Sequence, residues 1–124
     1  SGLAALQMAV IHLDNARYDQ AASFARRAGE AGITSARQST ILGRVYAMQG
    51  EVNLAEEAYR RALSITGDYP AAHLELGLLL INRGAIDEGI RELEQYMELA
   101  AKNPSQYRVN EIEVLVTQIK QTKQ

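Results

Sequence analysis

Apolar residues recur at steps of three and four along most of this chain, and short polar breaks separate the apolar stretches. Such steps place apolar side chains on one face of an α-helix. Helix-starting residues follow several breaks: Ser35 suits an N-cap, and Pro70 and Pro104 suit a first turn, where a missing N–H costs nothing. The pattern therefore predicts an all-α fold with seven helices, over residues 3–14, 19–31, 36–49, 53–66, 70–82, 87–101 and 104–121.

The last predicted helix has a competing interpretation. Between Glu111 and Thr117, apolar and polar residues partly alternate and β-branched residues are frequent, as in a strand. A lone strand would leave its hydrogen-bonding edges unpaired, and nothing else in the chain has a strand pattern. One helical face collects the apolar residues of this segment, which are Val109, Ile112, Val116 and Ile119. Helix is therefore the better interpretation.

The helical pattern returns every 34 residues. The stretch LGRVYAMQG at Leu42–Gly50 matches LGLLLINRG at Leu76–Gly84, and Met8–Ala16 is a weaker first copy with alanine in both glycine places. A fixed period of roughly 20–50 residues is the sequence signature of a solenoid, in which similar units stack on one another.

Polar residues recur at the same interval. Asp19, Asn53 and Asp87 each follow the small-residue turn, and the side chains of Asp and Asn accept hydrogen bonds from unpaired N–H groups at a helix start. Asn53 is followed three residues later by Glu56, which is the spacing of a capping box. We therefore expect these three recurring residues to cap the second helix of each unit.

Small residues recur in two roles. In each unit a small residue of the first helix is expected to face one of the second, in the pairs Ala9–Ala21, Gly43–Ala55 and Gly77–Gly89. A glycine inside a helix costs about 1 kcal/mol relative to alanine, so close packing must compensate for it. Gly50 and Gly84 instead lie just past a helix end, where glycine readily adopts a left-handed conformation.

One unit resembles the tetratricopeptide repeat in nearly every place of that family's pattern. The matching residues are Leu42, Gly43, Tyr46, Gly50, Ala55, Tyr59 and Ala62. The next unit departs from the pattern, with Leu80 and Leu93 in the aromatic places and Tyr96 in place of the last alanine. The resemblance covers residues 3–104 and implies a right-handed α-solenoid of three antiparallel helix pairs, with a C-terminal capping helix.

The resemblance also implies the domain organisation. We expect a single domain with repeats at residues 2–35, 36–69 and 70–103, followed by the capping helix at 104–121. Ser1 and Gly2 run directly into the apolar pattern, without the charged start of a signal peptide. We therefore expect this chain to be a fragment of a longer protein.

Composition narrows the classes of function. The formal net charge of −2 is too balanced for an electrostatic grip on nucleic acid, and the absence of cysteine excludes disulfides. The longest apolar run, around Leu78–Ile81, is far shorter than the ~20 residues that cross a bilayer. We therefore expect no nucleic-acid partner and no membrane insertion.

Candidate catalytic and metal-binding residues are few. His12 and His73 lie in different units, and His12 occupies an aromatic core position, which favours a packed, hydrogen-bonded ring over a metal ligand or base. Glu94 and Glu98 share a helix face, but acidic helix surfaces are commoner than catalytic carboxylate pairs. We expect no enzyme activity, no cofactor and no metal.

The resemblance implies a concave groove, lined by the first helix of each unit, that binds a peptide or a segment of a protein partner. The corresponding residues are Leu6, Val10, Leu13, Arg37, Thr40, Arg44, Leu74, Leu78 and Ile81. This groove would be apolar at both ends with arginines between, which suits a peptide with apolar anchors and an acid. The alternative is that some of these leucines belong to the core. Some family members hold the C-termini of chaperones with a carboxylate clamp. This chain has Leu6, Val10, Ala71 and Glu75 at the clamp positions, so the clamp is absent.

A structural assembly element is the second hypothesis. Leu3, Leu6, Val10 and Leu13 form an apolar stripe on the first helix, and an uncovered stripe of this kind tends to find a partner. The alternative function is therefore self-association into a homo-oligomer through that helix. The style of the repeats suggests a bacterial origin. A self-associating chain of this kind would then serve in assembly of the cell envelope or of a pilus.

Overall fold

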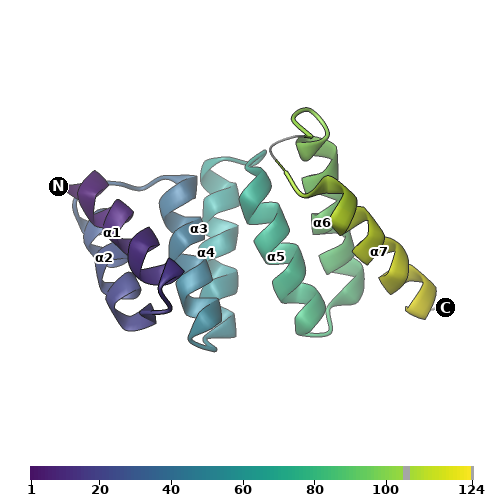
Figure 1. Ribbon diagram of the computed structural model, residues 1–124, viewed down its shortest axis with the longest axis horizontal. Helices are drawn as coiled ribbons and strands as arrows, with labels where there is room; N and C mark the ends of the chain where they lie inside the picture. The colour runs from purple at the N-terminus through teal and green to yellow at the C-terminus, as the bar shows by residue number, and fades with distance from the viewer. Residues whose placement is uncertain (105–106, 124) are drawn as a thin grey trace. The chain divides into compact units, whose positions relative to one another are not determined.

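The computed structural model describes residues 1–104 and 107–123. Within these ranges the chain is all-α and has no strand, so the predicted fold class is confirmed (Figure 1). The helices are α1 (Gly2–Asp14), α2 (Tyr18–Glu30), α3 (Ala36–Met48), α4 (Val52–Ile65), α5 (Pro70–Asn82), α6 (Ile86–Ala100) and α7 (Val109–Lys123). In this part of the chain, no helix combines the length and the apolar character that crossing a membrane requires.

The chain divides into two compact units, Ser1–Ala72 and His73–Gln124. In the first unit, α1 pairs with α2 and α3 pairs with α4 as antiparallel hairpins, and α2 also packs against α3 (Figure 1). Two clusters make up the core around α2: Leu6, Ala9, Ala25, Ala28, Ile41 and Leu42 in one, and Leu13, Ala21, Ala22 and Val45 in the other. The alanines of α2 leave room for larger side chains from the helices on either side of it.

The second unit contains nearly all of α5, together with α6 and α7. Its core cluster consists of Leu74, Ile90, Leu93, Tyr96, Ala100, Ile112 and Val116. Ile112 and Val116 are one turn apart on α7, and both are buried. The predicted capping helix therefore contributes apolar residues to this core.

Two glycines within helices lie where another helix comes close. A Cβ atom on Gly77 would lie 2.6 Å from Leu93 Cδ2 and 3.1 Å from the backbone oxygen of Gly89, which confirms the predicted close approach of Gly77 and Gly89. A Cβ atom on Gly43 would lie 2.5 Å from Tyr59 Cε1. The tightest neighbour of Gly43 is thus the Tyr59 ring, whereas Ala55 was expected.

The predicted turn glycines adopt the left-handed conformation. Gly50 has a φ of 78° and Gly84 a φ of 95°, and Ala16, in the same place of the first copy, has a φ of 58°. In each turn, the second residue of the bend donates its N–H back to the preceding helix, as Glu51 does to the Tyr46 carbonyl at 2.9 Å. This is the pattern by which a left-handed residue ends a helix.

The predicted caps of the second helices are wrong. The N-cap residues are Arg17, Glu51 and Ala85, and none of them makes a side-chain capping hydrogen bond. Asp19, Asn53 and Asp87 each lie one residue inside the helix, so the capping box of Asn53 with Glu56 does not form. After the tight left-handed turn, the next helix begins earlier than predicted, so the expected capping residues already lie within it. Ser35 does cap α3, because its Oγ accepts the N–H of Gln38 at 3.1 Å.

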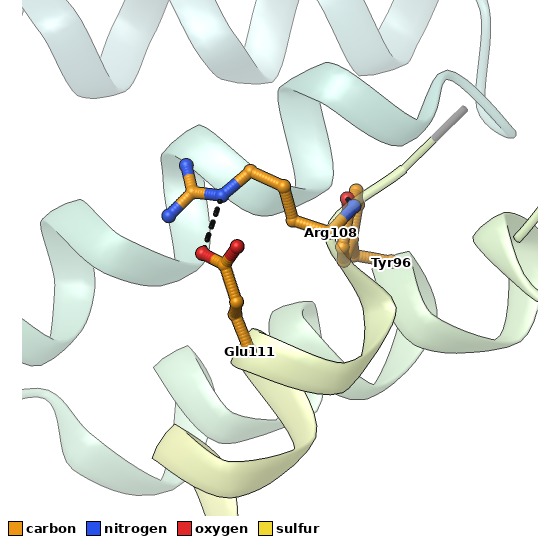
Figure 2. A network of polar contacts seen from close by, with 3 residues as sticks. All are labelled: Tyr96, Arg108 and Glu111. Carbon is orange, nitrogen blue, oxygen red and sulfur yellow. Dashed lines mark hydrogen bonds and ion pairs between the residues drawn. The ribbon is translucent and has the colours of Figure 1, made fainter. Parts of the chain in front are cut away.

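The start of the last helix also differs from the prediction. Pro70 begins α5 as expected, but Pro104 does not begin α7, which starts at Val109. Residues Ala101–Pro104 form turns, and Ser105 and Gln106, which the prediction included, lie outside the described residues. The Tyr96 hydroxyl accepts the backbone N–H of Arg108 at 2.9 Å, so the side chain that replaces the family's small alanine fixes the later start (Figure 2).

Candidate functional site: an apolar pocket in the second unit

An apolar pocket of about 370 Å³ opens on the surface of the second unit. Its lining residues are Ile81, Ile86, Leu115, Gln118, Ile119 and Thr122. They come from the end of α5, the start of α6 and the C-terminal half of α7. The pocket is at the small end of the range of ligand sites, about 300–1,000 Å³, and has room for one or two side chains of a partner.

Local structure explains why these residues meet. Gly84, with its left-handed φ of 95°, reverses the chain between α5 and α6 and brings Ile81 and Ile86 to the same edge. On α7, Leu115, Ile119 and Thr122 follow at steps of four and three, so they share one face of the helix. Helical periodicity thus produces an apolar wall on α7 opposite the turn.

The position of α7 determines the shape of the pocket, and contacts at both of its ends hold it. Near its start, the Arg108 backbone N–H donates to the buried Tyr96 hydroxyl (Figure 2). The Tyr96 ring also meets the Tyr107 ring edge-on, with 6.1 Å between the ring centroids. Towards its end, Lys120 Nζ lies 3.1 Å from Glu94 Oε2 on α6. The contacts near both ends of α7 therefore maintain the wall that faces the pocket.

The chemistry of the pocket is that of an aliphatic binding site. Isoleucine and leucine side chains supply its floor and walls, and no charged residue lines it among the side chains that the structure describes. Gln118 and Thr122 are the polar lining residues, and the Thr122 hydroxyl donates to the Gln118 carbonyl at 2.9 Å. Burying aliphatic groups of a ligand against such a surface is favourable, whereas a buried charge would find no group there to neutralise it.

The groove residues predicted for the first unit divide into buried and exposed ones. Leu6 and Leu13 are 2% and 8% exposed and pack in the core clusters. Thr40 is 4% exposed, and its hydroxyl donates to the Ala36 carbonyl at 2.7 Å. Val10 is half-buried, whereas Arg37 and Arg44 are exposed on α3. In this unit, the arginines are the predicted residues that a partner can reach most directly.

The predicted residues of the second unit lie close to the pocket. Leu74 is buried in the core, and Leu78 and Ile81 are half-buried against it. Of these, Ile81 also lines the pocket. Sequence reasoning assigned no ligand contact to α7, because that helix was interpreted as a cap that closes the solenoid. A usable signal was present, since Leu115, Ile119 and Thr122 form a second stripe beside the core stripe of Ile112 and Val116.

The histidines have different surroundings. The His12 ring stacks on Phe24 at 5.3 Å between centroids, and its Nδ1 accepts the Nε–H of Arg17 at 2.8 Å. This confirms the predicted packed, hydrogen-bonded ring. His73 Nδ1 lies 2.7 Å from Glu92 Oε2 and links α5 to α6. Among the described residues, no three His, Asp or Glu side chains are grouped as a metal site would require.

A larger depression of about 640 Å³ lies at the turn end of the first unit. Its lining is mostly polar and includes Arg17, Tyr18, Asp19 and Gln49. Gln49 Nε2 donates to Asp19 Oδ1 at 2.8 Å, so these groups already satisfy one another across two repeats. We assign this depression a structural role and take the apolar pocket as the candidate site.

Comparison with known proteins gives one family and a consistent set of structures. The family model of the TPR repeat, the tetratricopeptide repeat, matches residues 43–84. No curated protein matches the chain. The similar structures are less than 25% identical to this chain in sequence, so they show the fold alone.

Three of these structures contain a bound peptide or binding region. The Yersinia enterocolitica type III secretion chaperone SycD, with a peptide of the translocator YopD, has a TM-score of 0.87 at 18% identity, over 97% of this chain and 92% of that chain. PcrH with the chaperone-binding region of PopD has a TM-score of 0.87 at 14% identity, over 97% and 91%. The first TPR of Spaghetti (RPAP3), bound to an HSP90 peptide, has a TM-score of 0.85 at 17% identity, over 98% and 91%.

Proposed function

This chain belongs to the tetratricopeptide-repeat proteins, and we propose that it is a non-enzymatic module that binds a peptide segment of another protein. The observation that carries the proposal is the apolar pocket bounded by α7, which offers aliphatic walls to a partner's side chain. The solved relatives support the class of ligand, because their folds match this one and they hold peptides of other proteins.

The pocket suits a bulky aliphatic anchor, such as a leucine, isoleucine or methionine side chain. Burying such a side chain contributes about 1.5–3 kcal/mol when it leaves water completely. Ile81 and Ile119 would contact the anchor from opposite sides, and Gln118 at the rim would bond to the peptide backbone. A charged anchor would have no partner among the lining residues, so we expect the pocket to discriminate against it.

The exposed face of α3 suits acidic residues. Arg37 and Arg44 are seven residues apart, which corresponds to about 10 Å along a helix. Two carboxylates at a matching separation would give each guanidinium group its own partner. An extended peptide rises about 3.3 Å per residue, so acids three positions apart would match the two arginines.

The other predicted groove residues have a supporting role in this proposal. Leu6, Leu13, Thr40 and Leu74 are buried, so they would hold the helices that carry the contacting side chains. In the first unit Val10 is half-buried and would offer apolar area to a ligand there, and in the second unit Leu78 and Ile81 would do the same. Within each unit, we therefore assign direct contact to the exposed and half-buried members of the predicted set, and in the second unit also to the pocket residues from α7.

A selection of short random peptides displayed on phage tests the proposal. Binders selected on the wild-type chain are measured by fluorescence anisotropy against Thr122→Trp, in which an indole would fill the pocket from its rim. The matched control is Thr117→Trp: both threonines are exposed on α7, and each donates its hydroxyl to the carbonyl four residues before it at 2.9 Å.

We expect the selected peptides to share an aliphatic anchor. They should lose affinity for Thr122→Trp and keep it for Thr117→Trp. Failure to select any peptide, or equal binding to the wild type and to Thr122→Trp, would overturn the proposal.

A further inference from the structure

Gly89 on α6 lies directly against Ile81, the α5 residue that lines the apolar pocket. A Cβ atom on Gly89 would lie 2.6 Å from Ile81 Cγ1. Carbon atoms in ordinary contact are about 3.5–4.0 Å apart, so this position has no room for a side chain. The Ile81 side chain occupies the space that a side chain on Gly89 would need, and a larger residue there would have to displace it.

The internal repeat shows how this pair differs from its counterparts. The corresponding residues are Leu13 and Ala21 in the first repeat, and Ala47 and Ala55 in the second. Alanine thus occurs where the residue of the first helix is leucine or alanine. Glycine occurs where that residue, Ile81, is branched at Cβ and carries two groups close to its own backbone. The third repeat therefore holds a branched wall residue that its glycine accommodates.

The contact with Gly89 makes Ile81 a stiff wall of the pocket. A residue branched at Cβ has one strongly preferred χ1 rotamer in a helix. Because Cγ1 packs against Gly89, the rest of the Ile81 side chain keeps one position beside the pocket. Turning aside for a larger ligand group would need an unfavourable rotamer and would give up the contact with Gly89. The depth of the pocket on this side is therefore fixed.

The lining of the pocket leaves size as the main property by which it can select among apolar anchors. The described residues that line it carry no charge, and most of them are aliphatic. Two apolar anchors therefore differ chiefly in shape and volume when they enter it. In a hydrophobic pocket, one methylene group more or less changes the preference by about 10–200-fold. A wall that cannot move makes such discrimination effective.

We propose that the Ile81–Gly89 pair sets the size of the anchor side chain, so that the pocket selects aliphatic anchors over the larger indole ring of tryptophan. Ile81 contacts the anchor directly, and Gly89 is a positioning residue that acts through Ile81. This inference rests on the proposed function, because it takes the pocket as the place where a peptide anchor binds.

Two forms of one selected peptide test the preference, one with leucine and one with tryptophan at the anchor position. Fluorescence anisotropy measures the affinity of each form for the wild type and for Ile81→Ala, a change that copies the alanine of the second repeat. Ile81→Ala should shift the preference towards the tryptophan form by about tenfold or more. Leu79→Ala is the matched control and should leave the preference unchanged. Leu79 is half-buried on the same helix and is not among the residues that line the pocket.

A double-mutant cycle tests the role of Gly89. Gly89→Ala should weaken binding of the leucine form about tenfold, because the new Cβ would push Ile81 into the pocket. In an Ile81→Ala background, the same change should weaken binding less than about twofold, since no Cγ1 is left to displace. The new Cβ would lie 2.9 Å from the Gly77 carbonyl oxygen in either background, so a merely structural role predicts equal losses in both. If Gly89→Ala does not fold, the preference of Ile81→Ala decides alone.

The results separate this inference from the proposed function. An unchanged preference in Ile81→Ala, or equal losses in the two backgrounds, would overturn the role of the pair, even where Thr122→Trp still weakens binding and supports the proposed function. Peptides that bind Thr122→Trp as tightly as the wild type would overturn the proposed function, and this inference with it.

Discussion

Where the two helices of a repeat pack together, a small residue on one helix faces a larger residue on the other. Gly43 faces the large Tyr59 and Gly77 faces Leu93, whereas the first repeat has Ala9 and Ala25 in the corresponding places. A glycine is therefore needed where the residue opposite is large. Its helical cost of about 1 kcal/mol is offset by the packing that the absent Cβ allows.

A double-mutant cycle tests this pairing. Gly43→Ala should lower the free energy of unfolding by about 1–3 kcal/mol, because the new Cβ would meet the Tyr59 ring at 2.5 Å. In a Tyr59→Ala background, the same change should be neutral or stabilise by up to about 1 kcal/mol, since alanine is the better helix former. Urea denaturation measures both. An equal loss in the two backgrounds would show that the ring is not the cause.

The turn residues provide a second test at this scale. Ala16 has a φ of 58°, a conformation that costs an L-residue about 1–2 kcal/mol. Ala16→Gly should stabilise the chain by about 0.5–1 kcal/mol after the greater freedom of glycine in the unfolded chain is counted. Gly50→Ala is the reverse change: its Cβ would meet nothing within 4 Å, so the strain alone should destabilise by about 1 kcal/mol. Shifts of the same sign in the two variants would contradict this account.

At the scale of elements, the backbone and the side chain of Arg108 play different roles in the start of α7. The backbone N–H donates to the buried Tyr96 hydroxyl at 2.9 Å, whereas the side-chain Nε pairs with Glu111 Oε2 at 3.0 Å in solvent (Figure 2). Buried hydrogen bonds stabilise more than exposed ion pairs, because water competes with the latter. We infer that Tyr96 fixes the position of α7.

Two substitutions separate these roles. Tyr96→Phe should lower the free energy of unfolding by about 1 kcal/mol and speed amide exchange in α7 more than in α1. Glu111→Ala removes the exposed pair, whose side chains are 61% and 68% exposed, together with the acid in the first turn of α7, and should cost about 0.5 kcal/mol. Hydrogen exchange followed by mass spectrometry resolves the helices. A larger effect of Glu111→Ala on α7 would contradict the assignment.

Helical periodicity predicted most of the elements, because apolar steps of three and four reflect which face is buried. It did not predict the start of α7, since that depends on Tyr96 reaching across from α6, a contact that no local pattern encodes. The capping predictions for Asp19 and Asp87 were wrong for a similar reason: backbone bonds in the left-handed turns replace the caps. The pocket was only partly predicted through Ile81, because its other wall depends on how α7 packs.

At the scale of the molecule, the arginines of α3 should select for acidic peptides. Arg37→Ala and Arg44→Ala should each weaken binding of an acidic peptide to α3 of the first unit about two- to fivefold, as expected for exposed charge contacts. The loss should shrink in about 1 M salt, where the screening length falls to about 3 Å. Arg61→Ala, which removes an exposed arginine on α4, is the control. A loss of the same size at all salt concentrations would exclude an electrostatic contact.

Nuclear magnetic resonance of isoleucine δ-methyl groups tests the central claim most directly. Ile81, Ile86 and Ile119 line the pocket, whereas Ile11 and Ile65 are exposed in the first unit and serve as references. Titration with a phage-selected peptide should shift the three pocket methyl signals, leave the two references in place, and have no such effect on Thr122→Trp. Pocket signals that stay unchanged while the peptide binds, or shifts that persist in Thr122→Trp, would contradict the account.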